Sequence, residues 1–246
     1  MKKLFCFFSA VLLVISSCSS DDSKNSSSGF LKKIAGTLDD GQTYSFEYKY
    51  SGNKITKIID SDGGYKLFTY TENLISKIET YSNNVLDHVK TYSYNSNNQL
   101  SSFIIVYPNY PNWGRKKTFT YNTNGTVTIN YYNGDYNSQT NLYDTATVTF
   151  SNNQASQIFS SGKTNNYTYD NKNNPLKNVL GFDKIHLSEE SIEGITNNIT
   201  SMTSTNLDQS FINVFTYKSN EFPLKLEVVY NNTSTHPLYT LEYYYY

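Results

Sequence analysis

Residues 46–58 contain the stretch Phe46-Glu47-Tyr48-Lys49-Tyr50, the turn residues Ser51-Gly52-Asn53 and the returning stretch Ile55-Thr56-Lys57-Ile58. In the first stretch every second residue is aromatic, so its three rings lie on one face of a β-strand. Gly and Asn favour the tight turn that follows. These residues therefore predict one antiparallel β-hairpin with an aromatic face.

This hairpin unit recurs along the chain. Its later copies contain Phe68-Thr69-Tyr70, Tyr92-Ser93-Tyr94, Phe119-Thr120-Tyr121, Val148-Thr149-Phe150, Tyr167-Thr168-Tyr169 and Phe215-Thr216-Tyr217. The tyrosines that end the first four copies, Tyr50, Tyr70, Tyr94 and Tyr121, are 20, 24 and 27 positions apart. Each interval is long enough for one hairpin.

The repeats predict an all-β fold for residues 30–246, an elongated, twisted antiparallel sheet of stacked β-hairpins, because neighbouring hairpins pair locally. Asn124-Gly125 and Asn133-Gly134 favour primed hairpin turns. A closed or sandwiched β arrangement is the alternative, since an open single layer buries little on its second face. The aromatic end Tyr243–Tyr246 resembles that of an outer-membrane barrel. However, the expected strands of five to seven residues are shorter than the roughly 9–11 residues that cross a membrane.

One segment interrupts the repeats. Between Asp183 and Thr203 the alternating pattern is lost, and Leu187, Ile192 and Ile195 have apolar spacings of three to five. Ser188 is suited to cap the start of a helix. We therefore expect one short helix near residues 186–196, packed on the sheet.

The composition excludes several classes of protein. The 246 residues include 24 Tyr and 14 Phe and carry a formal net charge of −1. Aromatic and β-branched residues at this level are typical of β-sheets, not of disordered chains. Without a basic patch, no nucleic-acid partner is expected. The two cysteines, Cys6 and Cys18, cannot provide a disulfide framework once Cys6 is removed with a signal peptide.

The N-terminus has the features of an export signal. Lys2 and Lys3 precede an apolar run from Leu4 to Ile15, which fits the roughly 7–15-residue core of a secretory signal. The run ends in Ile15-Ser16-Ser17-Cys18, which resembles the lipobox of bacterial lipoproteins. This resemblance implies that residues 1–17 are removed and that lipid is attached at Cys18.

Residues 18–29 then have the polar composition of a flexible tether. Their Asp21-Asp22 pair resembles the acidic export signal of surface lipoproteins in Bacteroidota. The tether and lipid therefore imply a protein anchored to the outer membrane through Cys18, exposed at the cell surface in preference to the periplasm.

The Tyr-rich hairpins also resemble degenerate YD-type repeats of large extracellular β proteins. Together with Cys18 and its tether, the arrangement is similar to that of Bacteroidota lipoproteins with a DUF4595-like domain of unknown function. The residues that carry this resemblance are the units from Phe46 to Ile158, the stretch Tyr167–Leu176 and the hairpins after Phe215. The family implies a surface or periplasmic β domain and specifies no activity.

No catalytic or metal constellation stands out in the sequence. His88, His186 and His236 are far apart, whereas zinc ligands usually occur at short spacings. Asp60-Ser61-Asp62-Gly63-Gly64 fits a hairpin turn better than a calcium loop, since Asp and Gly favour turns directly. We therefore expect no enzyme activity, no cofactor and no metal.

The loop that contains Tyr107, Tyr110 and Trp113 is the candidate partner-binding site, because aromatic residues on a rigid loop can stack on sugars or anchor proteins. A structural role as a plug at one end of the sheet is the alternative. The leading functional hypothesis is a non-enzymatic envelope lipoprotein that binds a glycan, peptide or protein partner. The other hypothesis is a periplasmic structural or assembly lipoprotein without a small-molecule ligand.

Overall fold

The structure is a computed structural model that describes residues 29–188, 194–205, 210–230 and 237–246. In these residues it contains sixteen β-strands and one short 3-10 helix, η1 (Phe182–Lys184). The predicted signal peptide, Cys18 and the tether as far as residue 28 lie outside the described residues. None of the helical residues described forms a segment long and apolar enough to cross a membrane.

The strands follow one another along the chain and are separated mostly by short turns. They are β1 (Leu31–Leu38), β2 (Thr43–Ser51), β3 (Lys54–Asp60), β4 (Tyr65–Thr71), β5 (Leu74–Ser82), β6 (Val85–Tyr94), β7 (Leu100–Val106), β8 (Gly114–Tyr121), β9 (Val127–Gly134), β10 (Asn141–Ser151), β11 (Gln154–Ser160), β12 (Lys163–Tyr169), β13 (Ile199–Ser204), β14 (Phe211–Tyr217), β15 (Pro223–Tyr230) and β16 (Tyr239–Tyr245).

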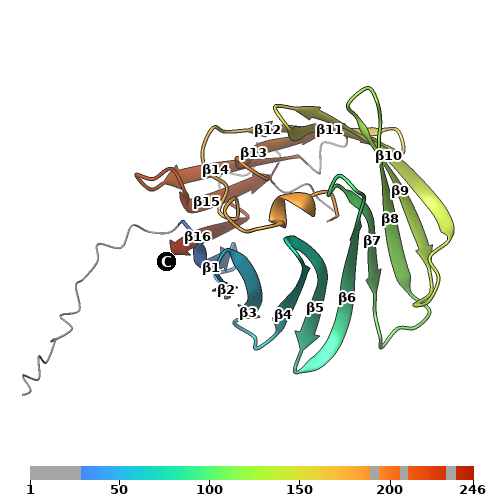
Figure 1. Cartoon of the computed structure of the whole chain (residues 1–246). Coiled ribbons are helices and arrows are strands. Elements are labelled where there is room, and N and C mark those ends of the chain that lie inside the picture. The colour runs from blue at the N-terminus through green and yellow to red at the C-terminus, as the bar shows by residue number, and fades with distance from the viewer. Residues whose placement is uncertain (1–28, 189–193, 206–209, 231–236) are drawn as a thin grey trace, which may run out of the picture.

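The sixteen strands form a closed antiparallel barrel (Figure 1). Each strand pairs with its neighbours in sequence, and β1 pairs with β16, from Leu31 opposite Tyr245 to Leu38 opposite Tyr239. The predicted all-β class is therefore confirmed, but the elongated open sheet is wrong. Closure removes both free edges and encloses the aromatic face, which an open layer would leave in water.

Most of the hairpins lie where the repeat predicts them, but Tyr167–Tyr169 ends β12, and a long connection instead of a tight turn leads to its partner β13. In β2, Phe46, Tyr48 and Tyr50 belong to an apolar core inside the barrel, whereas Glu47 and Lys49 alternate with them and form an ion pair on the outer face. The same polarity holds for β5, where Ile75 and Ile78 are buried in the core. These two strands thus turn their core side chains inward, whereas Phe159 of β11 and Val214 of β14 are 50% exposed.

A ladder of tyrosine hydroxyl groups joins successive hairpins. The hydroxyl of Tyr94 donates a hydrogen bond to the carbonyl of Ile75 at 2.6 Å, and that of Tyr121 donates to Leu100 at 3.2 Å. The hydroxyl of Tyr169 likewise donates to the carbonyl of Ala155 at 2.7 Å, whereas that of Tyr70 accepts a hydrogen bond from the N–H of Ile55 at 3.2 Å. The repeated tyrosine therefore connects the backbone of its own hairpin with that of the hairpin before it.

Three local expectations need correction. Residues 189–193 lie outside the described range, and the rest of residues 186–196 forms turns and bends. The helical turn lies earlier, at η1, so the helix predicted near residues 186–196 is wrong. Gly125 has a φ of 83° and lies in the predicted turn. Gly134 instead ends β9, where a Cβ would lie 2.0 Å from the Ser138 carbonyl oxygen, so glycine serves close packing. The strands also have 6–11 residues, longer than expected.

We predict that Tyr94→Phe lowers the free energy of unfolding by about 1–2 kcal/mol, because it removes one hydrogen bond to a buried carbonyl while keeping the ring. Urea denaturation measures the change. Tyr110→Phe is the matched control, since Tyr110 is 65% exposed. Equal stabilities of wild type and Tyr94→Phe would contradict a stabilising role for the ladder.

We also predict that alkali destabilises the barrel. Burial raises the pKa of Tyr70 and of Tyr131 from 10.0 to about 12. Between these values the folded protein keeps protons that the unfolded chain loses, so this contribution to stability is complete below pH 10 and is lost as the pH rises through 12. Phenolate absorbance during a pH titration, combined with urea denaturation at each pH, measures both effects. A single titration near pH 10 with unchanged stability would contradict the assignment.

Candidate functional site

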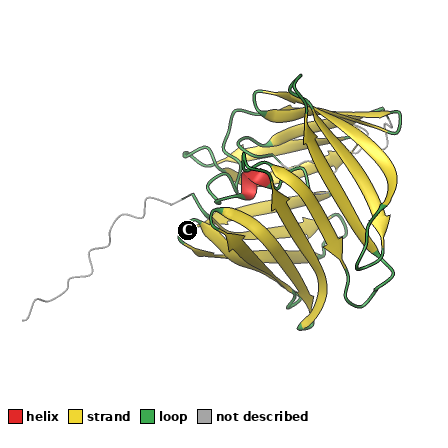
Figure 2. Ribbon diagram, turned by 45° about the vertical axis from the view of Figure 1, so that its right-hand side comes forward, coloured by secondary structure: helices red, strands yellow, loops and turns green. Residues whose placement is uncertain are grey.

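The interior of the barrel is partly filled by the segment between β12 and β13, whose described residues, 170–188 and 194–198, we call the plug. Its backbone bonds to the barrel end at Leu180, whose N–H donates to the carbonyl of Asn53 at 2.9 Å. On the opposite wall, Lys117 of β8 donates from its ammonium group to the carbonyl of Ser188 at 2.7 Å. The helical turn η1 therefore lies inside the ring of strands (Figure 2).

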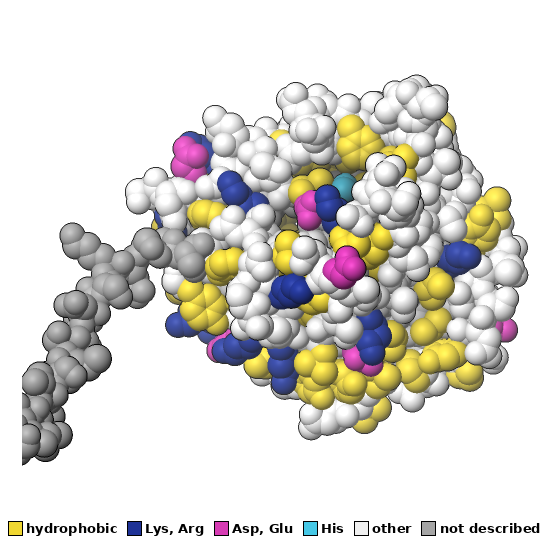
Figure 3. All heavy atoms as spheres, in the orientation of Figure 1, with side chains coloured by type: hydrophobic (Ala, Val, Ile, Leu, Met, Phe, Trp, Pro, Cys, Tyr) yellow, Lys and Arg dark blue, Asp and Glu magenta, His cyan; other side chains and the backbone are white. Residues whose placement is uncertain are grey.

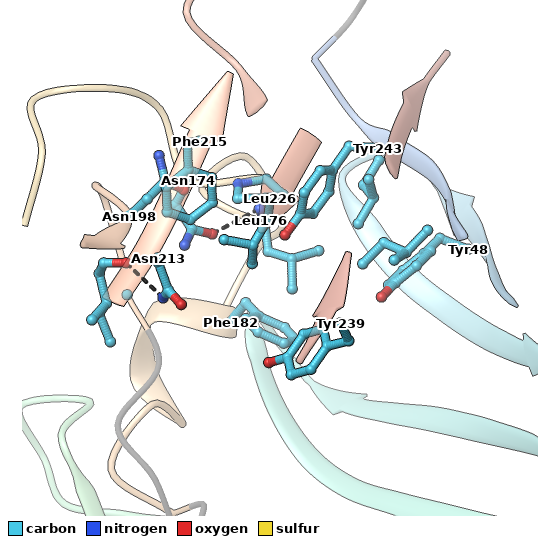
Figure 4. A pocket seen from close by; sticks show the side chains of 15 residues that line it. Tyr48, Asn174, Leu176, Phe182, Asn198, Asn213, Phe215, Leu226, Tyr239 and Tyr243 are labelled. Carbon is cyan, nitrogen blue, oxygen red and sulfur yellow. Dashed lines mark hydrogen bonds between the residues drawn. The ribbon is translucent and has the colours of Figure 1, made fainter. Parts of the chain in front are cut away.

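The first cavity lies between the plug and the wall formed by β1, β2 and β13–β16. Its volume is about 360 Å³, at the lower end of the roughly 300–1,000 Å³ of small-molecule sites. Figure 4 shows the rings of Tyr48, Tyr239 and Tyr243 on one side and the amide of Asn213 on the other. The other aromatic and amide side chains of the lining are Phe182, Phe215, Asn174 and Asn198.

Hydrogen bonds hold the three amides in place. Asn213 donates from Nδ2 to the carbonyl of Ile199 at 2.8 Å, which orients its Oδ1 toward the cavity (Figure 4). Asn174 Oδ1 accepts a hydrogen bond from the N–H of Leu176 at 2.9 Å. Asn198 donates to the carboxylate of Asp170 at 3.0 Å. The polar groups are thus fixed before a ligand arrives, which reduces the entropy lost on binding.

Charge is absent from the lining of this cavity, as far as the structure describes it. Burial raises the pKa of Tyr243, so its phenol stays neutral and can both donate and accept a hydrogen bond. The carboxylate of Asp170 binds Asn198 and the hydroxyl of Tyr217 and is therefore engaged in holding the plug. The chemistry available in the cavity is hydrogen bonding by neutral groups and stacking on aromatic rings.

A second cavity adjoins the first. It has a volume of about 190 Å³ and shares Tyr48, Leu176 and Phe182 with the first cavity. Its outer wall is formed by strands β3–β6, from which Lys66 and Lys90 contribute to the lining. The lining of the first cavity is thus neutral, and that of the adjoining second cavity is basic.

The two lysines occupy equivalent positions in the repeat. Lys66, Lys90 and Lys117 each stand four residues before a tyrosine of the ladder, namely Tyr70, Tyr94 and Tyr121. Asn213 has the same position relative to Tyr217. An even spacing places each of them on the inward face. The sequence analysis did not predict these residues. They could have been found as polar residues at an even spacing from the inward-facing aromatic residues of the same strand.

The predicted loop site lies at the end of the barrel opposite the plug, and we call this end the rim. Its aromatic residues form a cluster there. The rings of Tyr107 and Trp113 are 4.5 Å apart, and the Arg115 guanidinium lies 4.7 Å from the Trp113 ring centroid. His88 lies 5.3 Å from Tyr107. Tyr110 projects outward and is 65% exposed. The structure thus brings together two of the three predicted residues.

Hydrophobic side chains are abundant on this rim. Figure 3 shows them along the lower edge of the molecule, where the loops after β3, β5 and β7 turn. Val85 is 56% exposed and Trp113 is 38% exposed.

Asp60–Gly64 forms the predicted hairpin turn between β3 and β4. In the described residues no three His, Cys, Asp or Glu side chains are grouped to hold a metal; His236 and Cys18 lie outside them.

No protein-family model matches the chain, and no curated protein matches its sequence significantly. Among solved structures, the barrel is similar to that of a porin-like protein from Bacteroides uniformis. The TM-score is 0.57 at 15% identity, over 88% of this chain and 98% of that protein. At this identity the likeness shows the fold alone. The Bacteroidota, DUF4595-like and YD-type resemblances remain predictions.

Proposed function

We propose that this chain is a non-enzymatic binding protein of the outer envelope that holds a short glycan inside its barrel. The observation that carries the proposal is the first cavity, where aromatic rings and fixed amides surround an uncharged space of about 360 Å³. Sugar rings have apolar faces that pack on aromatic rings and hydroxyl groups that hydrogen-bond to amides and phenols. A mono- or disaccharide suits both features.

The polarity of the strands supports a barrel that lies in water. Membrane barrels turn an apolar band outward and often a polar face inward. Here the outward positions between buried core residues carry ion pairs, such as Lys77 with Glu79 at 3.0 Å and Lys49 with Glu47 at 3.1 Å. A barrel of this polarity needs another attachment to a membrane, and lipid on Cys18 supplies it.

The chain is therefore proposed to be an outer-membrane lipoprotein. Its barrel projects from the membrane at the cell surface on the tether of residues 18–29. The plug end carries the chain start of β1, whereas the rim with Tyr107, Tyr110 and Trp113 lies at the far end. This arrangement supports the rim as the face that meets a partner protein or a longer glycan.

Isothermal titration calorimetry with mono- and disaccharides tests the proposal. We expect at least one sugar to bind the soluble mature domain, and Asn213→Leu to weaken its affinity by about tenfold, since an unpaired sugar hydroxyl costs roughly 1–3 kcal/mol. Thr216→Leu is the matched control, because Thr216 is exposed on the outer face of the same strand.

Two outcomes would overturn the proposal. One is that no sugar binds, which would favour the alternative of a structural lipoprotein without a ligand. The other is that Asn213→Leu binds as tightly as Thr216→Leu while both variants unfold at the wild-type temperature.

A further inference from the structure

We propose that the second cavity binds a carboxylate, so that the ligand class of this barrel is an acidic sugar, with its ring in the first cavity. The inference rests on the proposed function for the position of the ring. It adds a charged subsite formed by Lys66 and Lys90, with Thr80 between them.

The strand register brings these three residues together. Lys66 of β4 lies directly opposite Thr80 of β5, and Lys90 of β6 lies opposite Ile78. Strands β4 and β6 are separated only by β5, so their backbones lie roughly 10 Å apart. Side chains as long as lysine can therefore converge on one group above Thr80, and all three residues line the same cavity.

Thr80 supplies an independent observation. Its Oγ1 is buried and has no hydrogen-bond partner among the described residues. A buried hydroxyl without a partner is costly, and native structures usually satisfy such groups. A carboxylate bound between the lysines could accept a hydrogen bond from this hydroxyl.

The charges around the cavity favour an anion. Its lining includes two lysines and no Asp or Glu among the residues that the structure describes. Asp60 and Asp62 line a neighbouring hollow at the rim, which shares Lys66 and Thr80 with the second cavity. Because Asp60 adjoins Lys66, we expect Lys90 to contribute more to the binding of an anion.

Lys117, the third lysine that stands four residues before a ladder tyrosine, has a different role from the two lysines of this site. Lys117 is buried, donates to the carbonyl of Ser188, and has its ammonium 5.3 Å from the Tyr131 ring centroid. It is therefore engaged with the plug. Lys66 and Lys90 line the second cavity, so the same repeat position contacts the plug at one strand and lines the proposed ligand cavity at two others.

Calorimetry with matched disaccharides tests the inference. Galactobiose is compared with digalacturonate, in which both hydroxymethyl groups are replaced by carboxylates, and cellobiose with cellobiouronate, in which one is replaced. We expect the acidic member to bind about tenfold more tightly than the neutral one, with a preference that falls as salt is added. Lys90→Met should remove most of that preference. Lys66→Met should reduce the preference by about threefold.

The control is Lys77→Met, which removes the same charge from β5 but on the outer face, where Lys77 pairs with Glu79. It should keep the full preference for the acidic sugar. Thr80→Val tests the hydroxyl without changing the charge and should weaken the acidic sugar alone. Near-ultraviolet circular dichroism verifies that each variant is folded.

The results separate the two proposals. If neutral sugars bind and acidic ones bind no more tightly, the carboxylate subsite is wrong and the proposed function stands. If the lysine variants keep the preference of Lys77→Met, the subsite is also wrong. If neither kind of sugar binds, both the subsite and the proposed function are overturned.

Discussion

The structure depends on one constraint: in β4, β6, β8 and β12 an inward tyrosine places its hydroxyl against the backbone of the preceding hairpin. The ring of such a tyrosine packs in the core, while its hydroxyl needs a partner once it leaves water. Tyr94 and Tyr121 find that partner in the carbonyls of Ile75 and Leu100. Burying the aromatic face and pairing the hydroxyl therefore select the same register in successive hairpins of the barrel that the β1–β16 pair closes.

The width of the barrel then determines what its interior can do. Eight strands leave a space that side chains fill, whereas sixteen leave a channel. Here the plug occupies part of that channel and adds Ile185 and Leu187 to the main core. What the plug does not fill becomes two chambers that share Phe182. The proposed ligand site is thus a consequence of strand number, and its chemistry follows from one inward position in each repeat, which is Asn213 on one wall and Lys66 or Lys90 on the other.

The sequence was informative about whatever depends on neighbouring residues. Alternation in residues 46–50 and the turn after them define a hairpin, and local pairing confirms it in β2 and β3. Closure was not predictable in the same way, because it depends on the sum of small twists over sixteen strands and on a pairing between Leu31 and Tyr245 at opposite ends of the chain. The cavity residues were missed for a related reason, since Asn174 and Asn213 meet only when the plug folds back into the barrel.

The central claim is that lipid on Cys18 alone attaches the protein to the membrane, while the barrel faces water. Fractionation of cells that express the wild type or Cys18→Ala tests this claim most directly. The wild type should sediment with the outer membrane and require detergent for release. Cys18→Ala should appear as a folded protein in the soluble fraction without detergent. If Cys18→Ala instead stays in the membrane and requires detergent, the barrel itself is inserted, and the polarity assigned to its strands would be contradicted.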